Sequence, residues 1–140
     1  MHALLYRSTS RPGLMARDLN DIIEEATVRN RVLGVTGLLL YGRIEAIVTA
    51  SGQFVQWLEG PEDTVEALYD AISEDPRHTD LEVLGRGDLA SGLEDAGPRL
   101  FSAWSMGLVR MSELPATLDG FLRFSATWDR SDVGEASLAD

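Results

Sequence analysis

The sequence contains no cysteine and no lysine, and its 140 residues include only two histidines, His2 and His78. Without cysteine, disulfide bonds, thiolate nucleophiles and thiolate-bound metals are excluded. Two histidines are too few for a histidine-rich metal site, so we expect no bound metal. No stretch approaches the roughly 20 consecutive apolar residues of a membrane span, and the N-terminus has no charged leader before a long apolar segment. These absences favour a soluble, cytoplasmic protein.

Basic residues are scarce as well. Twelve arginines stand against 23 acidic residues, which gives a net charge of −11 and a pI near 4.5. Nucleic-acid binding requires a basic surface that displaces counterions from phosphates, so nucleic acid is excluded as a partner. The apolar content of 44% is sufficient for the core of one domain.

The spacing of apolar residues predicts the order of strands and helices. Strands are expected at Ala3–Ser8, Val35–Tyr41, Phe54–Leu58, Leu81–Gly87 and Phe101–Val109. Helices are expected at Leu14–Asn30, from Pro61 to the segment Asp75–Asp80, and at Ser112–Ala126. The order βαββαββ describes a ferredoxin-like α+β sandwich with two helices on one sheet face. We expect the terminal helix on the other face, and we divide the chain into a domain at 1–110 and a helical extension with an acidic tail at 111–140.

One predicted strand contains an unexpected polar residue. Gln56 lies in the middle of Phe-Val-Gln-Trp-Leu, and alternation along a strand places it on the same face as Phe54 and Leu58. A buried amide without a hydrogen-bond partner costs about 1–3 kcal/mol. The sequence must therefore supply a partner for this side chain.

Other segments direct polar groups to the same interior. Tyr6 and Ser8 share a face of the first strand, and Asn30 continues the apolar stripe of Ile22 and Ala26 on the first helix. Each alone has an ordinary explanation: a lone buried tyrosine or glutamine is usually a satisfied core residue, and asparagine is common at helix C-termini. Two carboxamides and a phenol that converge in an apolar slot suit a planar heterocycle with carbonyl and imide edges.

These residues resemble the BLUF domain, a blue-light sensor that uses FAD. The matching motifs are YRS at 6–8, Asn30 followed by VTG at 35–37, QWLEGP at 56–61, DPRH at 75–78 and FSAWSMG at 101–107. Each motif is weak alone, but together they occur in the family's order and span most of the chain. The resemblance implies non-covalently bound FAD, for which FMN or riboflavin could substitute, and a photoreceptor rather than an enzyme.

The resemblance also implies roles for individual positions. Tyr6 matches the photoactive tyrosine, which gives an electron and then a proton to the excited flavin, and Gln56 matches the glutamine between that tyrosine and the flavin. Because an amide has a donor end and an acceptor end, rotation or tautomerisation reverses its hydrogen bonds, and the flavin absorption shifts to the red. Trp104 and Met106 match the pair whose placement beside the glutamine is debated in the family. Contacts with the cofactor are expected for Ser8, Ile22, Arg29, Asn30, Gln56, Ile72, Asp75, Arg77 and His78.

Two features depart from the family's pattern. Arg29 stands where the family usually has a polar amide or a histidine, and its fixed charge could still donate to a flavin carbonyl. The segment Gly42–Gln53 is longer than the usual tight hairpin. Its Ile44, Ile47 and Val48 could form an arm that makes a dimer edge, or the segment could be a tolerated loop insertion.

Three functions remain in consideration. The first is a photoreceptor that signals through a separate partner protein or through self-assembly as a homo-oligomer, because nothing after Val109 is long enough for a cyclase or phosphodiesterase. The second is a flavin-binding or protein-interaction module that has lost photosignalling, which Arg29 and the insertion would explain. The third is an acylphosphatase-like hydrolase, although the glycines do not cluster into a phosphate cradle beside an arginine.

Overall fold

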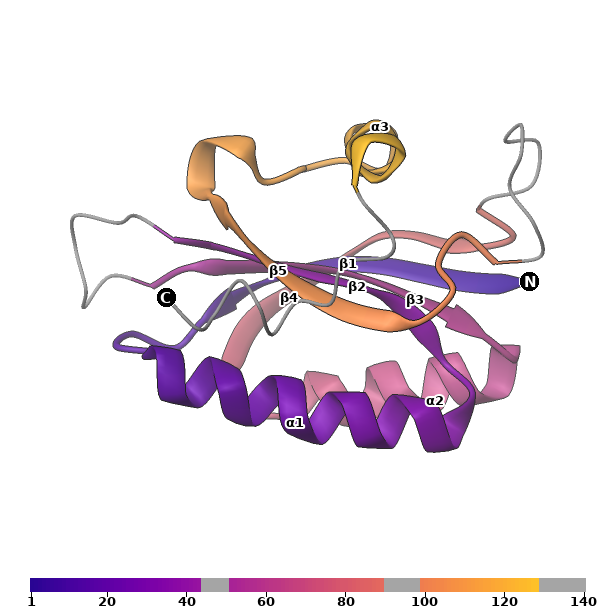
Figure 1. The fold of residues 1–140 in the computed structure, drawn as a ribbon, viewed down its shortest axis with the longest axis horizontal. Coiled ribbons are helices and arrows are strands. Elements are labelled where there is room, and N and C mark those ends of the chain that lie inside the picture. The colour runs from indigo at the N-terminus through magenta and orange to yellow at the C-terminus, as the bar shows by residue number, and fades with distance from the viewer. Residues whose placement is uncertain (44–50, 90–98, 129–140) are drawn as a thin grey trace.

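The computed structural model describes residues 1–43, 51–89 and 99–128. The strands are β1 (His2–Ser10), β2 (Thr36–Arg43), β3 (Gln53–Gly60), β4 (His78–Gly87) and β5 (Trp104–Arg110). The helices are α1 (Ala16–Leu33), α2 (Glu62–Ser73) and α3 (Leu118–Thr127), with a short 3-10 turn, η1, at Met111–Glu113. Figure 1 shows this order, which confirms the predicted ferredoxin-like α+β sandwich.

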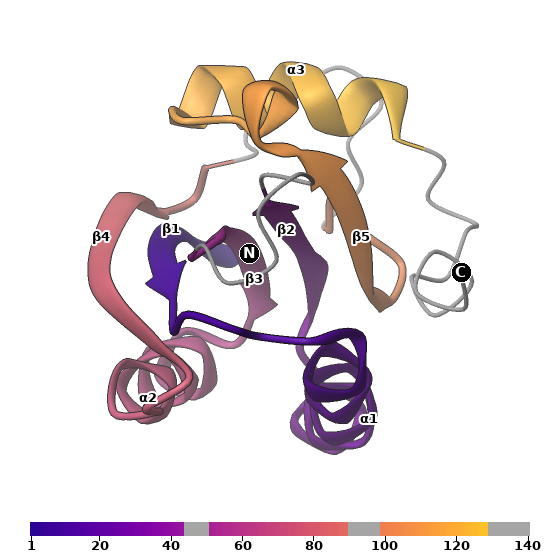
Figure 2. The ribbon, with the colours of Figure 1, turned by 90° about the vertical axis from the view of Figure 1, so that its left-hand side faces the viewer.

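The five strands form one sheet in the order β4-β1-β3-β2-β5. The central strand β3 pairs antiparallel with β1 and β2, and β5 runs parallel to β2 at one edge. Helices α1 and α2 cover one face of the sheet, and α3 lies across the other face, as expected (Figures 1 and 2). The molecule therefore has a core on each side of the sheet.

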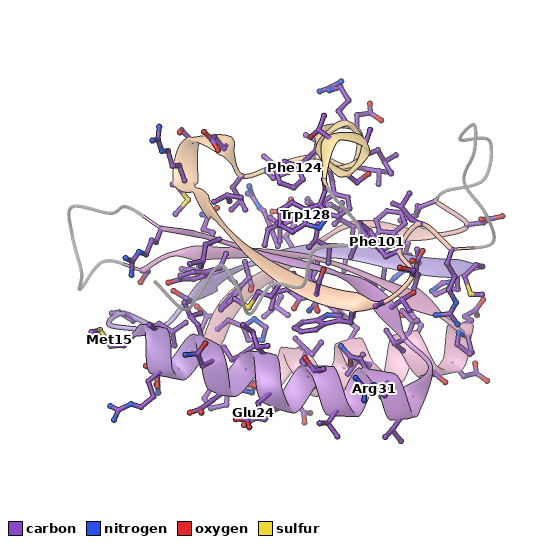
Figure 3. The ribbon with its side chains drawn as sticks, viewed as in Figure 1. Met15, Glu24, Arg31, Phe101, Phe124 and Trp128 are labelled. Carbon is purple, nitrogen blue, oxygen red and sulfur yellow. The ribbon has the colours of Figure 1, made fainter. Side chains whose placement is uncertain are left out.

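The side chains divide between these cores as strand alternation predicts. The core under α1 and α2 contains Tyr6 of β1, Phe54 and Leu58 of β3, and Trp104 and Met106 of β5. The core under α3 contains residues from the opposite strand faces together with apolar side chains of the C-terminal region: Leu5, Val55, Trp57, Leu100, Phe101 and Phe121. Figure 3 shows Phe124 and Trp128 between the sheet and α3, on the side away from α1.

Two helix boundaries differ from the prediction by a few residues. Helix α1 continues to Leu33 rather than ending at Asn30, and Gly34 stops it by adopting φ of 72°, a left-handed conformation that glycine tolerates. The apolar stripe ends earlier than the backbone helix because the last turn is exposed. Pro61 is the N-cap of α2 rather than its first helical residue.

The predicted helix at Ser112–Ala126 is wrong in its first half. Residues Met111–Glu113 form only η1, and α3 begins at Leu118. Pro115 explains the break, since proline has no N–H for a helical hydrogen bond and disfavours helical conformation in the residue before it. The side chain of Thr117 then caps α3 by accepting a hydrogen bond from the backbone N–H of Gly120 at 3.0 Å.

Some predictions concern residues outside the described ranges. The proposed arm residues Ile44, Ile47 and Val48 are among them, as are part of the predicted loop at 88–99 and the acidic tail at 129–140. Within the described part of the chain, β2 and β3 pair as far as Gly42 and Gln53.

Candidate functional site

Gln56 lies on the central strand β3, and its side chain forms hydrogen bonds with residues of β1 and β5. In the antiparallel register, Gln56 of β3 is opposite Tyr6 of β1 and opposite Leu39 of β2. Its Nε2 donates a hydrogen bond to Tyr6 Oη at 2.6 Å, and its Oε1 accepts one from Trp104 Nε1 at 2.9 Å. Tyr6, Gln56 and Trp104 therefore form a continuous buried hydrogen-bonded chain.

This geometry places Trp104, and not Met106, beside Gln56. Both side chains point to the same face of β5, so their alternation could not distinguish them. The Trp104 indole extends past β2 to the glutamine, whereas the fully buried Met106 packs in the core under α1 and α2. Met106 does not line the cavity described next.

A cavity opens between α1, α2 and the sheet. Most of the residues predicted for the site line it: Tyr6, Ile22, Arg29, Gln56, Ile72, Asp75, Arg77, His78 and Trp104. Sequence reasoning gave no site role to four further lining residues, Glu25, Ala26, Leu39 and Phe54. Glu25 had a recognisable signal, because positions 22, 25, 26 and 29 follow the i, i+3, i+4, i+7 spacing of one helix face.

Ser8 and Asn30 do not line this cavity. The buried hydroxyl of Ser8 lies behind it, 2.8 Å from His78 Nδ1. Asn30 lines a neighbouring cavity between the C-terminal end of α1, the start of β2 and the residues before β5. Trp104 lines both cavities.

The side-chain amide of Asn30 has one polar atom without a hydrogen-bond partner in the described part of the chain. Asn30 is fully buried, and its Nδ2 has no hydrogen-bond acceptor among the described residues. Its Oδ1 accepts a bond from Arg29 Nε at 3.2 Å, which leaves Nδ2 as the free end. An unsatisfied buried N–H is costly, so a bound acceptor is expected there. A carbonyl of an isoalloxazine ring is such an acceptor, and the apolar walls of Ile22 and Ile72 suit its faces, so these residues fit a flavin.

Three charged residues stand at the mouth of the cavity. Arg77 forms an ion pair of 3.0 Å with Glu25 of α1, and its Nε donates to both carboxylate oxygens of Asp75 at 3.0 Å. The hydrogen bond to Asp75 raises the pKa of Arg77. Together these contacts join α1 to the turn between α2 and β4 across the opening.

Burial controls the ionisation of the groups inside. It raises the pKa of the Tyr6 phenol well above its usual value, against the opposing effects of the Gln56 hydrogen bond and the charge of Arg29. Burial also lowers the pKa of Arg29. The phenol of Tyr6 is therefore held as a neutral O–H that can both donate and accept a hydrogen bond.

His78 is held in one neutral tautomer. Its Nε2 lies 2.8 Å from the carbonyl oxygen of Ile72, which can only accept, so Nε2 carries the proton. Nδ1 then accepts from the hydroxyl of Ser8. Burial lowers the pKa of His78, against the favourable effects of the Ile72 carbonyl and of Asp75. The ring is buried because His78 begins β4 with its side chain turned inward.

This histidine predicts a specific pH dependence of stability. Because the pKa of His78 is lower in the folded chain, the unfolded chain takes up the proton first as the pH falls below about 6.5. The contribution of neutral His78 to the free energy of unfolding is thus fully present above that pH and declines as the pH falls towards the folded-state pKa. We expect wild type to lose more unfolding free energy than His78→Asn between pH 7.5 and 5.5, measured by urea denaturation. His2→Asn serves as the control for the other histidine, and parallel pH profiles for wild type and His78→Asn would contradict the prediction.

Two features are absent from the described part of the chain. Among the described residues, no group of three histidine, aspartate or glutamate side chains is arranged to hold a metal ion. No helix within the same ranges is long and apolar enough to cross a membrane.

Comparisons with known proteins agree with this geometry. A family model described as BLUF, sensors of blue-light using FAD, matches residues 1–107. The photoactivated adenylate cyclase subunit beta of Euglena longa is 44% identical over 78 residues, which are 56% of this chain and 8% of that protein. The blue light- and temperature-regulated antirepressor BluF of Escherichia coli (strain K12) is 33% identical over 132 residues, which are 90% of this chain and 29% of that protein. The chain thus spans less than a third of the length of these two relatives.

A solved structure shows the same fold over most of the chain. The dark-state structure of BlrB, a BLUF protein, superposes with a TM-score of 0.62 at 32% identity, and the match covers 90% of this chain and 84% of BlrB. The family model alone covers more than half of the chain. The chain therefore belongs to the BLUF family of blue-light sensors that use flavin.

Proposed function

We propose that this chain is a blue-light photoreceptor that binds FAD and switches by reversing the amide of Gln56. The observation that carries this proposal is the position of the amide, with its donor end on Tyr6 Oη and its acceptor end on Trp104 Nε1. A carboxamide has a donor end and an acceptor end, and rotation of the amide exchanges their places without any change of charge.

The residues that would hold the cofactor surround this amide. Ile22 and Ile72 would contact the faces of the ring, and Asn30 Nδ2 would donate to a ring carbonyl. Asp75, Arg77 and His78 would lie along its outer edge and side chain. Bound flavin would supply the absorption of blue light and the electron acceptor for Tyr6.

Reversal of the amide has a defined consequence for its two neighbours. Gln56 Oε1 would then face Tyr6 Oη and accept its proton in a hydrogen bond. Gln56 Nε2 would face Trp104 Nε1, and two N–H donors cannot bond to each other. Trp104 would therefore lose its acceptor, and β5, which is held to the sheet by its edge pairing with β2, is the strand that would respond.

The output of this switch is part of the proposal. We propose that the chain signals to a separate protein partner and performs no chemistry on a substrate. The division at residue 110, the homo-oligomeric state and a cytoplasmic location stay predictions. Arg29, which motivated the alternative of a flavin-binding module without signalling, donates to Asn30 Oδ1 and so orients Asn30 for a flavin carbonyl.

One optical measurement tests the proposal. The purified protein, reconstituted with FAD, is expected to be yellow and to show a reversible red shift of its flavin absorption after blue illumination. A difference spectrum of lit against dark protein measures the shift. A yellow protein without reversible change would support the alternative, and a colourless preparation would contradict flavin binding.

A further inference from the structure

A buried carboxylate on the central strand has no role in the proposed switch. Glu59 of β3 is 1% exposed and lies three residues after Gln56, on the sheet face that α3 covers. Burying a carboxylate is unfavourable unless hydrogen bonds replace its hydration. Its partners should therefore reveal why an acid stands there.

Four donors converge on this carboxylate. Oε1 accepts from the backbone N–H of Leu100 at 2.8 Å and from Trp57 Nε1 at 3.2 Å. Oε2 accepts from the backbone N–H of Phe101 at 2.6 Å and from Thr36 Oγ1 at 3.1 Å. Thr36 in turn accepts a bond from Arg99 Nη1 at 3.0 Å. Charge-assisted bonds of this kind are among the stronger ones in proteins.

These bonds fix the segment that leads into β5. Glu59 holds Leu100 and Phe101, the backbone N–H of Gly37 donates to Ala103 O at 3.2 Å, and Gln56 holds the indole of Trp104. Strand β3 thus binds the segment 100–104 at both ends. Glu59 binds Leu100 and Phe101 on the α3 face of the sheet, and Gln56 binds Trp104 on the cavity face. When the Gln56 contact is broken, the Glu59 contact remains.

We propose that Glu59 is a positioning residue, whose carboxylate docks the segment 100–104 on the sheet and thereby holds the Trp104 indole against Gln56. The importance of that contact for signalling rests on the proposed function, but the contact itself does not. A carboxylate suits the position because all four neighbours are donors. Glutamine, the isosteric amide, would turn an N–H towards one pair of them.

The same carboxylate is linked to the opposite face of the sheet. Trp57, which donates to Glu59 Oε1, stacks on Phe121 of α3 with 5.5 Å between ring centroids and 3° between ring planes. Figure 3 shows Phe101, another of the residues that donate to Glu59, on the α3 side of the molecule. Glu59 therefore connects the position of Trp104 to the packing of α3.

The test follows the indole N–H of Trp104 by nitrogen-15 NMR, in flavin-free and in flavin-loaded full-length protein. The signal is assigned by its loss in Trp104→Phe. In Glu59→Gln we expect the resonance to move towards that of a free indole. We also expect its hydrogen exchange to accelerate about tenfold or more relative to the amides of the β1–β3 ladder, because one charge-assisted anchor is lost. The ladder amides report global unfolding and so separate positioning from general destabilisation.

Glu82→Gln is the matched control. Glu82 of β4 is an exposed glutamate that pairs with Arg7 at 3.3 Å, so the variant removes the same charge far from Trp104 and should leave its signal unchanged. If Glu59→Gln does not fold, Thr36→Val decides, because it removes one donor of Glu59 and should shift the same signal in the same direction by less. An unchanged Trp104 signal in folded Glu59→Gln, or in Thr36→Val where Glu59→Gln does not fold, would overturn the proposal. The readout needs no light, so a wild type without a red shift would refute the proposed function alone.

Discussion

Gln56→Leu is expected to abolish the light-induced red shift while the protein still binds flavin. Leucine has a volume similar to that of glutamine but neither a donor nor an acceptor, so Tyr6 Oη and Trp104 Nε1 lose the group that joins them. The cavity walls and Asn30 remain, which should preserve the yellow colour. The amplitude of the difference spectrum should fall to the noise level. The lost buried hydrogen bonds should also lower the free energy of unfolding by about 1–3 kcal/mol.

A second glutamine on the same strand provides the control. Gln53 begins β3, opposite Thr9 of β1 and Gly42 of β2, and lies on the other face of the strand from Gln56. Gln53→Leu should keep the full red shift. Flavin content is measured from the absorption ratio of the flavin and protein bands. A normal photocycle in Gln56→Leu would show that the amide is not the switching group.

Much of this site follows from the two-residue period of a strand. Once Gln56 is placed inside, Phe54 and Leu58 must accompany it, and Trp57 must face the other core. The same rule places Tyr6 towards the helices. These expectations agree with the structure because backbone geometry alone determines them, whatever the identity of the neighbouring side chains.

Where two side chains lie on the same face of an element, this rule cannot predict which of them makes a given contact. Trp104 and Met106 share a face of β5, and the choice between them depends on which side chain extends past β2 to an acceptor. Asn30 belongs to the correct helix stripe, yet it lies in the cavity next to the one that Arg29 lines. Helical spacing shows which residues share a face of a helix. It does not show how the helix is rotated about its axis above the sheet, so it cannot assign a single residue to one of two neighbouring cavities.

Glu59 shows a different limit of sequence reasoning. An acidic residue at the end of a strand normally suggests solvent, and its partners Leu100 and Phe101 are more than 40 residues further along the chain. Both contribute only backbone N–H groups, which every residue except proline has. No pattern of side-chain types in the sequence could therefore indicate this contact.

Gly37→Ala is expected to disrupt the sheet itself. A Cβ atom at Gly37 would lie 1.8 Å from the backbone oxygen of Trp57 and 2.9 Å from its carbonyl carbon. The obstacle is main chain of the central strand, which cannot move without breaking the β2–β3 ladder that also aligns Gln56 with Leu39. We expect a loss of at least about 3 kcal/mol in the free energy of unfolding, a large part of the stability of a typical domain. Urea denaturation followed by circular dichroism measures the loss.

Gly34→Ala separates this steric effect from the conformational preference of glycine. Gly34 has φ of 72°, and a Cβ atom added there would meet nothing within 4 Å, so alanine should cost only about 1–2 kcal/mol of backbone strain. The two substitutions add the same methyl group three residues apart, at the C-cap of α1 and near the start of β2. Since the β2–β3 ladder also positions the cavity wall, Gly37→Ala should lose flavin binding together with stability, whereas Gly34→Ala should keep the yellow colour. Equal stability of the two variants would contradict the close approach of β2 to β3 at Trp57.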